Sequence, residues 1–221
     1  MSYYPVFLDL RERPALVVGG GEVAHGKIVA LLRAGARVTV VAPHLVESIE
    51  RLVQDGKITL VTRPYAAEDV RGFHLVVATT GDAEIDRRVS SDAQRAGVLV
   101  NVVDQAALSS FIAPAVLERG NLQIAVSTSG SSPALAVSLR DRLEREVGPE
   151  YAVALAILRE VRARLRAGEQ TSDDRRRILR ELADGRLVDR VRAKDRAGVD
   201  TLLASLAGQG MTLKALGIEL D

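Results

Sequence analysis

Residues 15–24 have the sequence ALVVGGGEVA, in which a short apolar strand runs directly into three glycines and then into a segment with helical spacing. Gly19, Gly21 and Ala24 fit the dinucleotide fingerprint, whose last glycine can be replaced by alanine. Gly19 permits the tight turn, Gly21 leaves room for a pyrophosphate, and Ala24 allows close packing of helix on strand. A glycine-rich turn without a ligand is the alternative, but the flanking strand and helix favour a dinucleotide site at the helix N-terminus.

The composition excludes several classes of protein. The chain has 221 residues, enough for one large or two smaller domains, and 30 basic against 29 acidic residues leave a net charge of +1. No strong field therefore points to nucleic acid or to a membrane surface. Cysteine is absent, which excludes disulfides and thiolate chemistry and fits a reducing compartment. With no visible signal peptide and no apolar run of about 20 residues, we expect a cytoplasmic protein without membrane or nucleic-acid partners.

The first part of the chain alternates β-branched runs with helical segments, which predicts an α/β fold with a doubly wound, Rossmann-type parallel sheet. Glycines near the ends of the helices are expected to stop them. The expected strands are 15–18, 37–41, 58–61, 75–78, 98–102 and 122–126, the helices are 23–34, 45–54, 85–96 and 112–119, and the stop glycines are Gly35, Gly56, Gly97 and Gly120.

The character of the chain changes after Val126. A hydroxyl-rich loop, 127–133, opens a connecting helix in which Pro133 suits the first turn. No convincing strand follows between residues 134 and 221, and apolar residues at helical spacing predict a small all-helical domain over 148–221. Its expected helices are 150–167, 174–183, 187–193 and 199–207.

The expected cofactor site lies at the ends of two strands. The second strand ends in Ala42, Pro43 and His44, without the carboxylate that usually binds the ribose hydroxyls, so backbone at Pro43 and His44 would hold the ribose. No arginine follows to receive a 2′-phosphate, which favours NAD over NADP. Thr79 and Thr80 follow the fourth strand at the same sheet edge, where open α/β sheets bind ligands.

Asp104 and the hydroxyl-rich loop each allow two interpretations. Asp104 leaves the fifth strand at this edge, where its carboxylate could take a proton while a hydride leaves to the cofactor; alternatively it caps a turn before residues 105–108. The loop is either an anion or substrate cradle or an ordinary helix cap. Spacing alone favours a cap in both cases. The histidines, His25, His44 and His74, belong to no ligand motif, so no metal site is expected.

Taken together, these segments resemble the precorrin-2 dehydrogenase/sirohydrochlorin ferrochelatase module of sirohaem synthesis. The resemblance is clear over about residues 3–147, and its motifs are specific in this order and at these spacings. It rests on PVFLDL at 5–10, VVGGGEVA at 17–24 with Lys27, GARVTV at 35–40, ATT at 78–80, NVVD at 101–104, SFIAP at 110–114, AVS at 125–127 and SPALA at 132–136.

The resemblance implies NAD-dependent oxidation of precorrin-2 to sirohydrochlorin, and it leaves open whether ferrous iron is also inserted as a substrate to give sirohaem. The family's cofactor positions fall on Glu22, Val23, Pro43 and His44, and its key aspartate falls on Asp104. Family members are homodimers, which implies a dimerisation segment over 114–147. This segment separates a 1–113 NAD-binding domain from the 148–221 helical domain. The loop expected to line the tetrapyrrole cleft comprises Ser127, Thr128, Ser129, Gly130, Ser131 and Ser132.

The chain departs from the family at two places. His25-Gly26-Lys27 replaces a basic pair after the glycine turn, and Thr128 replaces a serine, which puts any serine-specific modification in doubt. Arginines in the tail could contact the carboxylates of the macrocycle, although nearly balancing acids make a solvated helix face the simpler interpretation. A non-catalytic NAD-sensing or tetrapyrrole-binding module is the alternative function.

Overall fold

The computed structural model describes residues 3–220. The chain divides into two compact units. One holds the residues up to Ala113 together with Ser129–Ser131, and the other holds Pro114–Thr128 and the residues from Ser132 onward. None of the helices in the described range is long and apolar enough to cross a membrane.

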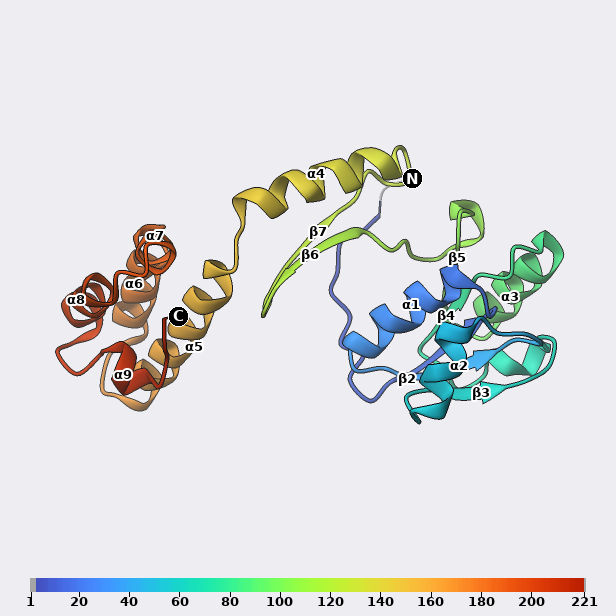
Figure 1. The fold of residues 1–221 in the computed structure, drawn as a ribbon, viewed down its shortest axis with the longest axis horizontal. Coiled ribbons are helices and arrows are strands. Elements are labelled where there is room, and N and C mark those ends of the chain that lie inside the picture. Colours follow the sequence, from blue (N-terminus) through green and yellow to red (C-terminus); the bar gives the residue numbers. More distant parts are fainter. Residues whose placement is uncertain (1–2, 221) are drawn as a thin grey trace. The chain divides into compact units, whose positions relative to one another are not determined.

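The first unit is built on a five-stranded parallel sheet with the order β3-β2-β1-β4-β5 (Figure 1). Every neighbouring pair is parallel, and at the carboxyl edge Val18 pairs with both Val41 and Ala78. This arrangement confirms the doubly wound fold. The strands are β1 (Pro14–Val18), β2 (Arg37–Val41), β3 (Thr59–Val61), β4 (Leu75–Ala78) and β5 (Leu99–Val102).

Each face of the sheet has its own apolar core. Along β1, Ala15 and Val17 belong to the cluster that packs with α1 (Glu22–Arg33) and α2 (Glu47–Gln54). Leu16 and Val18 belong to the cluster on the other face, with the 3-10 helix η1 (Ala67–Val70) and α3 (Ala83–Arg95). Alternation of side chains along a strand explains the division. The expected stop glycines are confirmed at Gly35, Gly56 and Gly97, each with a positive φ directly after a helix cap.

The expected helix over 112–119 is wrong. Ala115–Arg119 is a strand, β6, and it pairs antiparallel with β7 (Leu122–Val126) in a separate two-stranded sheet. Gly120 therefore does not end a helix; it opens a two-residue hairpin turn with φ 57°, as a type II′ turn requires. Short apolar runs are ambiguous between helix and strand, and here pairing with β7 decides. For the same reason 122–126 is a strand, as expected, but outside the parallel sheet.

The rest of the second unit is helical. After the hairpin come α4 (Pro133–Glu146), α5 (Glu150–Ala167), α6 (Ser172–Leu182), α7 (Arg186–Arg192), α8 (Arg196–Ala207) and α9 (Leu213–Leu216). Within the described residues no strand follows Val126, as expected, while the short α9 was not anticipated. The core of these helices is fully buried at Ile157, Val161, Leu165, Leu182, Leu187 and Leu203.

Candidate functional site

The three glycines after β1 are required for different reasons. Gly19 adopts φ 124°, and a Cβ there would lie 2.9 Å from the Thr79 carbonyl oxygen. A Cβ on Gly20 would overlap the His44 carbonyl oxygen, so this glycine serves packing against the loop after β2. A Cβ on Gly21 would meet no atom within 4 Å. Packing within the protein therefore does not require a glycine at position 21, and the space beside it remains available to a ligand.

The N-terminus of α1 is left without a side-chain cap. Gly21 is its N-cap residue, so no side chain accepts from the first-turn N–H groups, which include those of Glu22 and Val23. By contrast, α3 is capped by Asp82, whose carboxylate accepts from Glu84 N at 2.8 Å and from Ile85 N at 3.1 Å. Free N–H groups and the helix dipole favour an anion. The glycine turn therefore offers a phosphate site that α3 does not.

A cavity of about 540 Å³ opens beside this turn, at the carboxyl edge of the sheet. The predicted residues Gly19, Gly21, Pro43, His44, Thr79 and Thr80 all line it, whereas Glu22, Val23 and Asp104 are not among its lining residues. The remaining wall consists of Val18, Gly20, Val41, Ala42, Leu45, Val46, Pro64, Tyr65, Asp82 and Ile85. Half of these residues follow β2 and β3, the side of the sheet that holds the adenosine half of a dinucleotide.

The hydroxyls of Thr79 and Thr80 already have partners within the protein. Thr79 Oγ1 donates to the Val18 carbonyl oxygen at 3.1 Å, and Thr80 Oγ1 donates to the buried Asp86 at 2.7 Å. Asp82, the acid in the cavity wall, is occupied as the α3 cap. Polar recognition in this cavity therefore falls on backbone groups and on His44, and apolar side chains supply most of the surface around them.

Asp104 lies two residues beyond β5, at the same sheet edge. A hydrogen bond from Val103 N to the Ala78 carbonyl oxygen, 3.0 Å, holds the chain beside β4. Asp104 adopts φ 60°, a left-handed conformation that is uncommon outside glycine and often marks functional sites. Its side chain is exposed and makes no hydrogen bond or ion pair to the residues described. The following 3-10 helix starts after Gln105, so Asp104 does not cap it.

The hydroxyl-rich loop is partly structural. Thr128 Oγ1 donates to the Ser132 carbonyl oxygen and accepts from Ser132 N, both at 3.0 Å. Ser132 Oγ accepts from Leu135 N at 3.2 Å and so caps α4. The cap interpretation therefore holds for Ser132. Between these residues the chain turns through positive φ at Ser129 and Gly130, and Ser127, Ser129, Gly130 and Ser131 are exposed.

Two kinds of sequence comparison, with family profiles and with individual proteins, point to the same family. The sequence profile of an NAD(P)-binding family matches residues 6–115, and that of the sirohaem biosynthesis protein central family matches residues 119–146. Siroheme synthase of Chromobacterium violaceum is 41% identical over 197 residues, 89% of this chain and 42% of that relative. Siroheme synthase of Methylobacillus flagellatus is 36% identical over 211 residues, 95% of this chain and 45% of that relative. The chain belongs to the family of the sirohaem synthase NAD(P)-binding module.

A solved structure of the same family supports the fold. SirC, a precorrin-2 dehydrogenase, superimposes with a TM-score of 0.76 at 27% sequence identity, over 90% of this chain and 98% of that chain. This chain spans less than half the length of the siroheme synthases that it matches.

The cavity lining includes two residues that the sequence did not point to, Pro64 and Tyr65. They follow β3 at the same edge as the glycine turn. Their position directly after an expected strand, 58–61, is the signal that could have found them, because ligands bind at the carboxyl ends of parallel strands.

Several arginines of the tail form surface ion pairs. Arg159 pairs with Glu160 at 3.1 Å, and Arg177 lies 3.4 Å from Glu181 and 3.7 Å from Asp174. Exposed pairs of this kind contribute little to stability. Among residues 3–220 no three histidine, aspartate or glutamate side chains gather in a way that could hold a metal ion.

Proposed function

We propose that this chain oxidises precorrin-2 to sirohydrochlorin, with NAD as the hydride acceptor, in sirohaem biosynthesis. The observation that carries the proposal is the arrangement at one sheet edge. An uncapped helix and an open glycine turn face a cavity at the ends of β1 and β2, while an unpartnered carboxylate leaves β5. The likeness to a precorrin-2 dehydrogenase over nearly all of that protein adds the substrate class.

The residues of the cavity suit NAD. The empty space at Gly21 and the free N–H groups of α1 would receive the pyrophosphate, and when bound the nicotinamide supplies a hydride acceptor. No acid or arginine follows β2 directly. Arg63, which directly precedes the cavity residue Pro64, is held by Asp69 through hydrogen bonds of 2.8 and 2.6 Å. A 2′-phosphate would lack a free cation there, which supports NAD over NADP.

Asp104 is proposed as the proton acceptor of the reaction. Oxidation removes a hydride and a proton from the macrocycle, and a carboxylate oxygen of Asp104 would take the proton. The exposed side chain and its lack of partners leave both oxygens available. The left-handed backbone at this residue gives the side chain a direction that an ordinary extended strand would not give.

The loop Ser127–Ser132 is proposed to bind the tetrapyrrole. Precorrin-2 carries several carboxylates, which accept hydrogen bonds from hydroxyls and backbone N–H groups. The turn at Ser129, Gly130 and Ser131 is exposed, while Thr128 and Ser132 fix its ends through their mutual hydrogen bonds.

We also propose that residues 114–147 form a homodimer interface. In α4, Leu135 is 60% exposed and Leu139 is 44% exposed, and in β6 Val116 is 38% exposed. Large apolar side chains gathered on one element are typical of an interface. Sedimentation velocity of the full chain should give a dimer, and Leu135→Arg together with Leu139→Arg should give a folded monomer; a monomeric wild type would refute the interface.

Anaerobic incubation of the full chain with precorrin-2 and NAD tests the enzyme assignment. We expect NADH and sirohydrochlorin to appear together, with much less turnover when NADP replaces NAD. Folded protein that binds NADH but turns over no substrate would instead support a non-catalytic module.

Addition of ferrous or cobaltous ion to sirohydrochlorin in the same preparation decides whether the chain also inserts the metal. We place the enzyme in the cytoplasm, in keeping with its lack of cysteine.

A further inference from the structure

Tyr65 contributes an aromatic ring to the wall of the cofactor cavity. It lies in the segment that connects β3 to β4, and only 8% of its surface is exposed. It belongs to the same buried cluster as Val18 and Val41, the last residues of β1 and β2. The ring is therefore set close to the strand ends over which the adenosine half of a dinucleotide is expected to lie.

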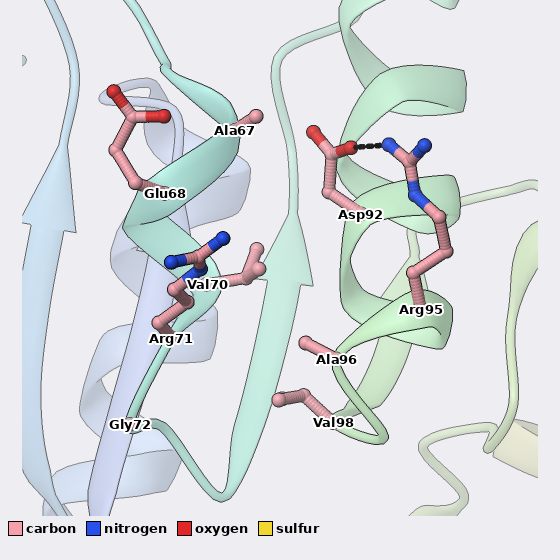
Figure 2. A pocket seen from close by; sticks show the side chains of 9 residues that line it. All are labelled: Ala67, Glu68, Val70, Arg71, Gly72, Asp92, Arg95, Ala96 and Val98. Carbon is pink, nitrogen blue, oxygen red and sulfur yellow. Dashed lines mark hydrogen bonds and ion pairs between the residues drawn. The ribbon is translucent and has the colours of Figure 1, made fainter.

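The hydroxyl of Tyr65 is not free for a ligand. It donates a hydrogen bond of 2.9 Å to Asp92 Oδ2 on α3, 27 residues away in the sequence. Asp92 is 8% exposed, and its other oxygen pairs with Arg95, as Figure 2 shows. Burial raises the pKa of the Tyr65 phenol, and the hydrogen bond to Asp92 raises it further, so the phenol keeps its proton. The ring is the part of Tyr65 that remains for a ligand.

Polar contacts fix the segment that carries this ring. Asp69 accepts from Arg63 and from Ala66 N at 2.9 Å, which closes the loop around Tyr65. A second cavity of about 530 Å³ is lined by residues of η1 and of the C-terminal part of α3, including Val70 and Arg95 (Figure 2), and Tyr65 is not among its lining residues. The hydrogen bond from Tyr65 to Asp92 ties the ring to α3 and so has a direct part in holding it in place.

We propose that the ring of Tyr65 binds the adenine end of the cofactor, and that Asp92 is the positioning residue that holds the ring there. The proposal rests on the proposed function and adds the group that recognises adenosine. The cavity has no free acid for the ribose, and the hydroxyls of Thr79 and Thr80 are committed. Recognition then falls on backbone groups, on His44 and on flat or apolar surface, and an aromatic ring is well suited to a purine.

NADH affinity of the full chain tests the proposal without any need for turnover. The chain contains no tryptophan, so the fluorescence of NADH can be followed without tryptophan emission. Tyr65→Ala should raise the Kd for NADH by roughly tenfold or more, a loss typical of removing an aromatic ring from beneath a base. Asp92→Ala should raise it severalfold, and Asp92→Asn should restore most of the affinity because its amide oxygen still accepts from the phenol.

Phe73→Ala is the matched control. Phe73 packs against the same buried cluster but does not line the cavity, so its loss should lower thermal stability and leave the Kd unchanged. In turnover assays the Tyr65 and Asp92 variants should raise KM for NAD and leave kcat near the wild-type value, because neither residue touches the reacting atoms.

The outcomes separate this proposal from the one on which it rests. A wild-type chain that does not bind NADH would refute the cofactor assignment itself. A wild type that binds NADH, with a folded Tyr65→Ala variant of unchanged Kd, would refute only the role of the ring. If Tyr65→Ala does not fold, the comparison of Asp92→Ala with Asp92→Asn decides: equal affinities would refute the positioning role.

Discussion

Gly20 and Gly21 are neighbours in one turn, yet the structure predicts opposite results when each is replaced by alanine. In Gly20→Ala the new Cβ would overlap the His44 carbonyl oxygen and lie 2.9 Å from Leu45 Cδ2 and 3.1 Å from Ala42 Cβ. Relief requires the backbone after β2 to move by about 1 Å, since carbon atoms pack at roughly 3.5–4.0 Å. Overpacking of this kind costs about 3 kcal/mol.

Gly21→Ala should behave differently. Its Cβ meets nothing within 4 Å, and the backbone, φ −88° and ψ −176°, is extended and suits any residue. Loss of glycine flexibility in the unfolded chain should raise stability by about 0.5 kcal/mol, while alanine is a poorer N-cap than glycine by a similar amount, so stability should stay within about 1 kcal/mol of the wild type. The added methyl group would nevertheless occupy the space that the pyrophosphate needs, so the Kd for NADH should rise at least tenfold.

Urea unfolding and NADH fluorescence, measured on the same preparations, check the pair. Gly20→Ala should show a large loss of stability, and Gly21→Ala a loss of cofactor affinity at near wild-type stability. A Gly21→Ala variant that binds NADH as well as the wild type would refute the placement of the pyrophosphate at this turn. A fully stable Gly20→Ala variant would show that the loop after β2 does not depend on this glycine.

Three further predictions follow from other parts of the chain. Asp104→Asn should fold normally and bind NADH but lose turnover, whereas Asp104→Ala should in addition be about 1 kcal/mol less stable, because alanine tolerates the left-handed backbone poorly; full activity of either variant would remove Asp104 from the mechanism. The hydrogen bond from Arg63 lowers the pKa of Asp69, so the stability it supplies is present above about pH 4 and is lost as the pH falls through the lowered folded pKa. Urea unfolding should therefore show a smaller acid-induced loss for Asp69→Asn than for the wild type, and equal losses would contradict the linkage. Leu182→Ala should cost about 3 kcal/mol of stability in the helical unit, yet leave the Kd for NADH unchanged because the cavity residues all lie in the first unit; a changed Kd would mean that the two units are coupled.

The parallel sheet could be predicted because its signals are local. The apolar run 75–78 and the β-branched run 37–41 are buried strands with the bounds expected of them. A glycine after each helix places the helix ends correctly to within a few residues. Such patterns report how each short segment meets a core, and that requirement acts on neighbouring residues along the chain.

The hairpin of β6 and β7 and the backbone conformation of Asp104 could not be predicted in this way. Residues 115–119 form a strand because residues 122–126 lie beside them. Hydrogen bonding between these two short segments outweighs a weak helical pattern. The aspartate at position 104 was identified from its place after a strand, but its left-handed backbone and its freedom from the following 3-10 helix appear only in three dimensions.

The sequence by itself determined the strand–glycine–helix turn at 15–24, the doubly wound sheet and the sheet edge at which ligands bind. The tertiary structure decided which glycine serves packing and which leaves space, and it brought Tyr65 against Asp92 across 27 residues. The physical reason is the same in each case. Propensity and periodicity act between near neighbours, whereas the shape of a cavity depends on atoms that only the folded chain brings together.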